Sequence, residues 1–135
     1  FLVALKFYLE RHAGQPRRTI VRYWSSPRPA DETFAALRAL LGIGADDLRP
    51  GARYAATTAG GDPIAGAIVA VDPGKLLVAS VDQLGDALVG LTVHATKSGA
   101  YVNFIVGTFG LPDADYDQAK ARWSQLLEQA GPATA

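Results

Sequence analysis

The sequence contains no cysteine, and this absence excludes several kinds of chemistry. A chain without thiols can form no disulfide, hold no metal through a thiolate and use no cysteine nucleophile. Such a composition fits a reducing compartment, and we therefore expect a cytoplasmic protein. Long apolar runs are also lacking. None reaches the roughly 18 residues that a membrane-spanning helix needs, so the sequence predicts no transmembrane segment.

An excess of charge of either sign is lacking too. Thirteen lysines and arginines balance thirteen acidic residues, so the chain as a whole has no field that would attract nucleic acid or an anionic membrane. Arginine is densest in the first part of the chain, but no nucleic-acid motif or interleaved aromatic residue accompanies it. We expect neither nucleic acid nor a membrane among the partners.

Histidine is scarce, which narrows the possibilities for catalysis. The two histidines are His12 and His94. His12 ends a predicted helix, where a cation is favourable, and His94 alternates with the apolar residues of a predicted strand, which directs it to the opposite face. No serine, histidine and acid follow a recognisable order, and residues 113–117 lack the later glycine and glutamate of a calcium loop. We predict no catalytic residue, no metal site and no cofactor.

Apolar periodicity and turn residues divide the chain into helices and strands. Spacings of three and four predict helices, whereas runs rich in β-branched and aromatic residues between glycine, proline and aspartate turns predict strands. The predicted helices cover residues 1–13, Asp31 to about Leu41, and the residues after Pro112 to about Gln129. The predicted strands are Arg17–Trp24, Arg53–Thr58, Ile64–Val71, Leu76–Asp82, Ala87–Thr96 and Tyr101–Phe109.

The last strand and the last helix organise the predicted fold. Residues 101–109 are almost continuously apolar, which predicts a strand near the centre of its sheet with at least one face covered. The helix that follows has apolar residues at spacings of three and four and polar residues on the other side, so it should cover that sheet. The apolar stripe consists of Tyr116, Ala119, Trp123, Leu126, Leu127 and Ala130.

Short turns join the strands after residue 53, so these strands must be antiparallel neighbours. A parallel connection would need a crossover of a dozen residues or more. We therefore predict an α+β fold with a curved antiparallel sheet of about six strands around a long C-terminal helix, a helix inserted after the first strand, and an extra N-terminal helix. A long twisted sheet curls around its closing helix and leaves a cavity in which a ligand can sit.

Several short motifs add a family resemblance to this outline. They are residues 30–37, residues 49–54, residues 66–78 with an Asp-Pro-Gly-Lys turn, and the Phe109–Pro112 turn followed by Trp123. Their order and spacing resemble the START-like, or helix-grip, superfamily (also called SRPBCC), and especially its branch similar to the activator of the heat-shock-protein-90 ATPase. The resemblance covers roughly residues 18–130 and implies the helix-grip fold. Two positions depart from the branch, because Val81 stands where it often has tryptophan and Thr108 where it often has histidine.

The resemblance also implies an internal cavity and its lining. The inward positions that we take as ligand-binding candidates are Phe34, Tyr54, Val81, Leu91, Phe104, Thr108 and Trp123. Val81 in place of tryptophan makes room in such a cavity, and Tyr54 and Thr108 are the polar groups that could orient a bound molecule. The same side chains would also suit a filled core, and that alternative stays open.

Three functions are compatible with this outline. The first is a noncatalytic binding domain that encloses a small hydrophobic or aromatic ligand between the sheet and the C-terminal helix. The second, implied by the resemblance, is a protein-interaction or co-chaperone-like module. The third is an enzyme of the polyketide cyclase or dehydrase kind, which needs a polar pair in the cavity, and only Tyr54 and Thr108 are available. We favour the first and expect a small apolar or aromatic ligand.

The segment before residue 17 has a pattern of its own. Lys6 and Glu10 lie opposite an apolar stripe at helical spacing, made of Phe1, Leu2, Leu5, Tyr8 and Leu9. The segment resembles the end of the same branch's C-terminal helix, so we expect a fragment of a tandem protein, with residues 1–16 the tail of a preceding homologous domain and residues 17–135 the helix-grip domain. An N-terminal extension packed on its own domain is the alternative. The stripe must be covered in either case, and we expect a homo-oligomer formed through residues 1–13.

Overall fold

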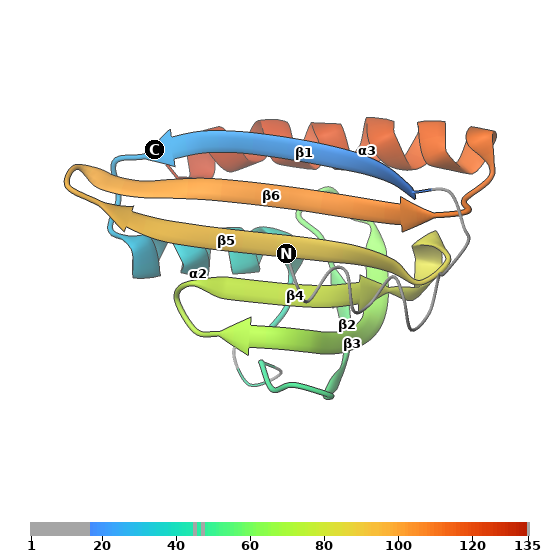
Figure 1. Ribbon diagram of the computed structural model, residues 1–135, viewed down its shortest axis with the longest axis horizontal. Coiled ribbons are helices and arrows are strands. Elements are labelled where there is room, and N and C mark those ends of the chain that lie inside the picture. The colour runs from blue at the N-terminus through green and yellow to red at the C-terminus, as the bar shows by residue number, and fades with distance from the viewer. Residues whose placement is uncertain (1–16, 45, 47, 135) are drawn as a thin grey trace.

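The computed structural model describes residues 17–44, 46 and 48–134. A six-stranded antiparallel sheet has the order β1-β6-β5-β4-β3-β2, and two α-helices pack on it (Figure 1). The strands are β1 (Arg17–Ser26), β2 (Arg53–Thr57), β3 (Pro63–Asp72), β4 (Leu76–Val81), β5 (Ala87–Thr96) and β6 (Gly99–Phe109). The helices are α2 (Ala30–Leu41) and α3 (Asp113–Ala133), and a short 3₁₀ helix, η2 (Asp82–Leu84), follows β4. The predicted α+β helix-grip arrangement is confirmed.

The strand order agrees with the prediction from turn length, with one exception. Each strand from β2 to β6 is antiparallel to the strand before it. However, β1 pairs with β6 from Arg17 opposite Phe109 to Ser26 opposite Ala100. β6 therefore lies one place from the edge, and the prediction that it is near the centre was wrong. The pairing of the first strand with the last is long-range, and the lengths of local turns do not determine it.

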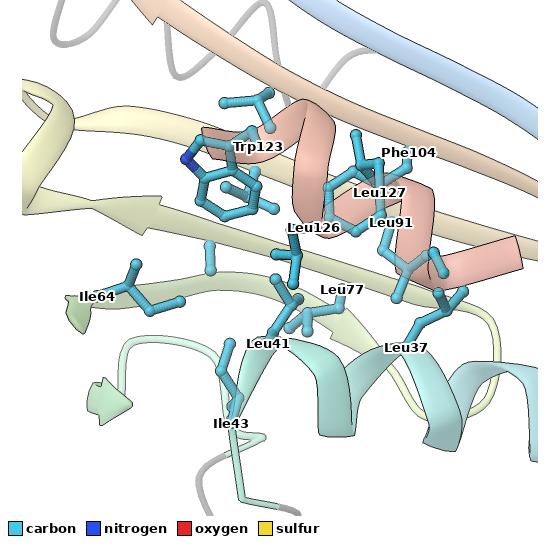
Figure 2. Packing of buried hydrophobic residues seen from close by; sticks show 14 of the residues in the cluster. Leu37, Leu41, Ile43, Ile64, Leu77, Leu91, Phe104, Trp123, Leu126 and Leu127 are labelled. Carbon is cyan, nitrogen blue, oxygen red and sulfur yellow. The ribbon is translucent and has the colours of Figure 1, made fainter. Parts of the chain in front are cut away.

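Both described helices lie on one face of the sheet, which we call the inner face (Figure 1). Leu77, Leu91 and Phe104 are aligned across β4, β5 and β6, and all three are buried in the main hydrophobic core. Figure 2 shows Leu37 and Leu41 of α2 and Leu126 and Leu127 of α3 directed toward this face. The core thus lies between the inner face and the two helices. We call the opposite face the outer face.

Strand β5 shows the alternation that the sequence predicts. Val89, Leu91 and Val93 are buried, whereas Thr92 is half-buried and His94 is exposed. Successive side chains of a strand point to opposite faces, so the apolar set enters the core and His94 lies on the outer face. This position separates His94 from the interior between sheet and helices.

Element boundaries follow local backbone chemistry. The N–H of Thr33 donates to the carbonyl oxygen of Pro29 at the start of α2, and the helix ends at Gly42, whose φ of 76° lies in the left-handed region. Glycine is required at that position because a Cβ there would also lie 2.1 Å from the carbonyl oxygen of Thr57. The prediction missed η2, and β4 is one residue shorter than expected. α3 extends four residues beyond its predicted end.

Two sequence predictions concern residues that the structure does not describe. The helix at residues 1–13 and the assignment of residues 1–16 to a preceding domain lie outside the described residues. Within the described residues, neither helix combines the length and the apolar composition of a membrane span.

Candidate functional site

A cleft of about 500 Å³ opens between α3 and the end of the sheet where β3 begins and β4 ends. Its volume is within the range of roughly 300–1,000 Å³ that is usual for small-molecule sites. Figure 2 shows Trp123 of α3 and Ile64 of β3 facing the same space. The apolar lining consists of Pro63, Ile64, Val81, Leu84, Leu111, Ala119, Trp123 and Leu126, and the polar lining of Thr58, Asp62, Gln83, Asp115, Gln118 and Arg122.

The cleft lies beyond the point where the backbone ladder between β3 and β4 ends. The two strands are paired from Ile68 to Asp72, whereas residues 63–67 pair with β2. Side chains of β4 and η2 replace the missing ladder, because the N–H of Ala67 donates to Ser80 Oγ at 2.9 Å and the N–H of Ala65 donates to Gln83 Oε1 at 2.9 Å. The start of β3, with Pro63 and Ile64, forms one wall of the cleft, with α3 opposite.

Tyr54 links β2 to β4 across the start of β3. It lies in β2 opposite Gly66 of β3, and its hydroxyl donates to the carbonyl oxygen of Ser80 in β4 at 2.6 Å. The Tyr54 side chain thus passes from β2 to β4 at Gly66 of β3, which has no side chain in the way. Burial raises the pKa of the Tyr54 hydroxyl and Asp82 raises it further, whereas Arg53 opposes the change. The hydroxyl therefore stays protonated at neutral pH and is already used as a donor within the fold.

Replacing Tyr54 with phenylalanine should lower the free energy of unfolding by about 1–2 kcal/mol. The reason is that the substitution leaves the Ser80 carbonyl without the donor that it has in the buried fold. Urea denaturation at neutral pH measures the change. An unaltered midpoint would show that the hydrogen bond is not important for stability.

The pH dependence provides an independent check on Tyr54. Its pKa is raised in the folded state, so its contribution to stability is fully present below the ordinary tyrosine pKa of about 10 and is lost as the pH rises above that value. We expect the wild-type protein to lose more stability than Tyr54→Phe between about pH 9 and pH 11. Parallel denaturation curves for the two proteins over that range would contradict the assignment.

The predicted binding residues are distributed between the cleft and the core beside it. Val81 and Trp123 line the cleft. Phe34, Leu91 and Phe104 are buried in the same hydrophobic cluster as these two, and the Phe104 ring lies 6.2 Å from the Trp123 ring between centroids. Their participation in binding stays a prediction.

Thr108, the second polar residue predicted to orient a ligand, also makes a hydrogen bond within the fold. Its hydroxyl donates to the carbonyl oxygen of Arg18 at 3.0 Å, and the residue is buried on β6 next to β1. It does not line the cleft that the structure describes. Thr108 and Tyr54 therefore both donate their hydroxyl protons to strand carbonyl oxygens, and their participation in ligand binding stays a prediction.

Sequence reasoning missed the polar rim of the cleft. Arg122 of α3 forms an ion pair with Asp62 in the turn before β3, and both residues line the cleft. The helical pattern placed Arg122 on the side of α3 away from the sheet, although its long side chain reaches the rim. Gln83 and Asp62 are turn residues, and their types are common on any surface, so no local signal marks them as neighbours of Trp123.

A second hollow, of about 640 Å³, lies at the other end of the sheet near the turn between β3 and β4. His94 lines it together with Asp31 and Lys75. It is not part of the space between sheet and α3. Among the described residues, no group of three or more histidine, aspartate or glutamate side chains is placed to hold a metal ion.

Comparison with known proteins gives the fold a precedent. No protein-family model matches the chain, and no curated protein matches it. Among solved structures, the Aha1 dimer from Colwellia psychrerythraea is similar with a TM-score of 0.67 and 10% identity, over 87% of this chain and 96% of that one. The AHSA1-like protein from Aeromonas hydrophila has a TM-score of 0.62 and 15% identity, over 86% of this chain and 91% of that one.

Another similar structure is CalU16 from Micromonospora echinospora. Its TM-score is 0.67 and its identity 20%, over 85% of this chain and 73% of that one. At such identities the similarity concerns the arrangement of strands and helices. The chain has the helix-grip fold in the form found in Aha1 and AHSA1-like proteins.

Proposed function

We propose that this domain binds a small apolar or aromatic molecule, without catalysis, in the cleft between α3 and the sheet. The observation that carries the proposal is the cleft itself, which has an apolar floor containing Val81 and Trp123 and a polar rim. Burial of apolar ligand surface would contribute about 25 cal/mol per Å². The part of the Trp123 indole that borders the cleft would contact an aromatic ring.

The polar residues that the sequence offers as catalytic candidates support binding rather than catalysis. The hydroxyls of Tyr54 and Thr108 donate to backbone carbonyl oxygens, and His94 lies on the outer face. An acid–base mechanism needs a group with a pKa near the working pH within hydrogen-bond reach of the substrate. The pKa of Tyr54 is shifted away from that range, and the rim residue Arg122 is paired with Asp62.

A protein-interaction module is the second candidate, and two observations favour it. One structure similar to this chain is described as a dimer. In addition, Tyr23 and Tyr101 are exposed large aromatic residues, at 60% and 40% of their surface, and both lie on the outer face. Sedimentation equilibrium of the full chain tests association. A monomer over the whole accessible concentration range would remove homo-oligomer formation as its function.

Filling the cleft should abolish binding. Val81 is fully buried at the end of β4 and lines the cleft, so Val81→Trp places a large ring in that space. Val81→Ile is the matched control because it adds one methyl group. We expect the affinity for the aromatic probe anilinonaphthalene sulfonate, whose fused rings are apolar and whose sulfonate is charged, to fall at least about tenfold in Val81→Trp, equivalent to roughly 1.4 kcal/mol, and to change little in Val81→Ile.

The experiment requires that both variants fold. Fluorescence titration measures the affinity, and a thermal melt of each variant confirms a cooperative transition. If folded Val81→Trp binds the probe as tightly as the wild-type protein, the probe occupies another site and the proposal fails.

A further inference from the structure

The outer face of the sheet carries a second apolar cluster that is separate from the main core. Val78, Leu88 and Phe109 form it, and they are 7%, 5% and 4% exposed. Val78 lies between Leu77 and Ala79, which belong to the main core, so its side chain points away from the helices. We call these three residues, together with the partly buried Val69, Ala70 and Leu76 that pack on them, the outer-face cluster.

The burial of this cluster is not explained by the described helices. Both α2 and α3 lie on the inner face (Figure 1). Asn103 lies on the outer face as well, since it alternates with the core residues Val102 and Phe104, and its Oδ1 atom is buried with no hydrogen-bond partner among the described residues. A solvated sheet face would leave such groups accessible to water. The outer-face cluster therefore needs an apolar cover, and the buried Asn103 Oδ1 needs a hydrogen-bond donor beside it.

We propose that the cover is residues 1–13 of the same chain, docked on the outer-face cluster through their apolar stripe. The length of this apolar stripe suits the width of the outer-face cluster. A helix of that length would measure about 20 Å. Four neighbouring strands, from β6 to β3, span about 14 Å at roughly 4.8 Å per step, and the cluster has members on each of them.

The connection between the segment and the sheet favours the same chain over a second copy. β1 starts at Arg17, which is paired with Phe109 of the cluster. The linker at residues 14–16 can extend over at most about 10 Å. Residue 13 must therefore lie within reach of the cluster. A short tether also gives an effective concentration in the millimolar range, which a second copy at ordinary concentrations does not reach. Docking would cover the stripe and give the sheet a layer on each face.

The absence of cysteine makes a direct test possible. Lys6→Cys introduces a single thiol on the polar side of the segment, where a nitroxide spin label does not disturb the apolar stripe. In the ¹⁵N-labelled chain of 135 residues, the amide signals of Val78, Leu88 and Phe109 should lose most of their intensity. Signals of α3, on the far side of the sheet, should keep most of theirs. Absence of broadening at the outer face would overturn the proposal.

A mixed sample separates the two possible occupants. Spin-labelled chains without ¹⁵N are mixed with ¹⁵N chains without the label. Docking within one chain predicts unchanged intensities in the mixture, and broadening of the outer-face signals there would assign the surface to a second copy and overturn the proposal. Leu5→Asp, added to the labelled chain, should restore the outer-face intensities, whereas the matched change Glu10→Gln on the polar side should not. Broadening that persists with Leu5→Asp would also contradict docking through the stripe.

Discussion

Gly66→Ala should destabilise the domain by about 3 kcal/mol or more, an effect at the upper end of those caused by overpacking. A Cβ on Gly66 would lie 2.0 Å from the carbonyl oxygen of Ser80, which also accepts the hydrogen bond from Tyr54. The obstacle is backbone rather than the end of a flexible side chain, so β3 would have to move away from β4. Gly90→Ala is a suitable control because no atom lies within 4 Å of the corresponding Cβ position.

Thermal and urea denaturation of the two alanine variants measure this effect. Gly66→Ala should have a much lower midpoint or fail to accumulate as folded protein, while Gly90→Ala should stay within about 1 kcal/mol of the wild-type protein. Equal stability of the two variants would mean that β2, β3 and β4 do not approach at Gly66 as described.

Trp123→Ala should lower the free energy of unfolding by about 3 kcal/mol, the lower end of the range for truncation of a buried tryptophan. Trp123 is 6% exposed and packs against Phe104, so its loss removes a large apolar contact. The cost should stay at the lower end because Trp123 also borders the cleft, and water can enter the space that the indole leaves. The same change removes the aromatic wall of the proposed binding site.

Trp123→Phe is the matched variant for separating stability from binding. It keeps an aromatic ring near Phe104 and should recover more than half of the lost stability. Urea denaturation and probe titration of both variants are the measurements. A Trp123→Ala protein with wild-type stability and wild-type probe affinity would contradict both roles of this side chain.

Much of the fold follows from local pattern. The alternation in β5 identified which residues enter the core, and turn residues fixed the succession of antiparallel strands. The apolar stripe of α3 was correct at Ala119, Trp123 and Leu126, all of which are buried. These features depend on residues close together in sequence, where side-chain period and turn chemistry leave few alternatives.

The candidate site was harder to predict because long-range contacts create it. Where the β3–β4 ladder ends, side-chain hydrogen bonds of Tyr54, Ser80 and Gln83 join the strands, and these residues come from different segments. From the sequence, the Tyr54 hydroxyl is a plausible ligand contact. Only its distance to the Ser80 carbonyl oxygen shows that it already donates a hydrogen bond within the fold. Turn residues such as Asp62 become part of the rim through the position of α3, which no local pattern contains.

Binding of an apolar ligand beside Trp123 can be tested directly, because the chain has two tryptophans. Trp24 Nε1 donates to Thr134 Oγ1 at 3.0 Å, and neither residue lines the cleft, so the indole N–H of Trp24 serves as an internal reference. In a ¹H–¹⁵N titration of the full chain with anilinonaphthalene sulfonate, we predict a progressive, saturable shift of the Trp123 indole signal and little change for Trp24. A saturable titration that leaves the Trp123 signal in place would contradict binding in the cleft.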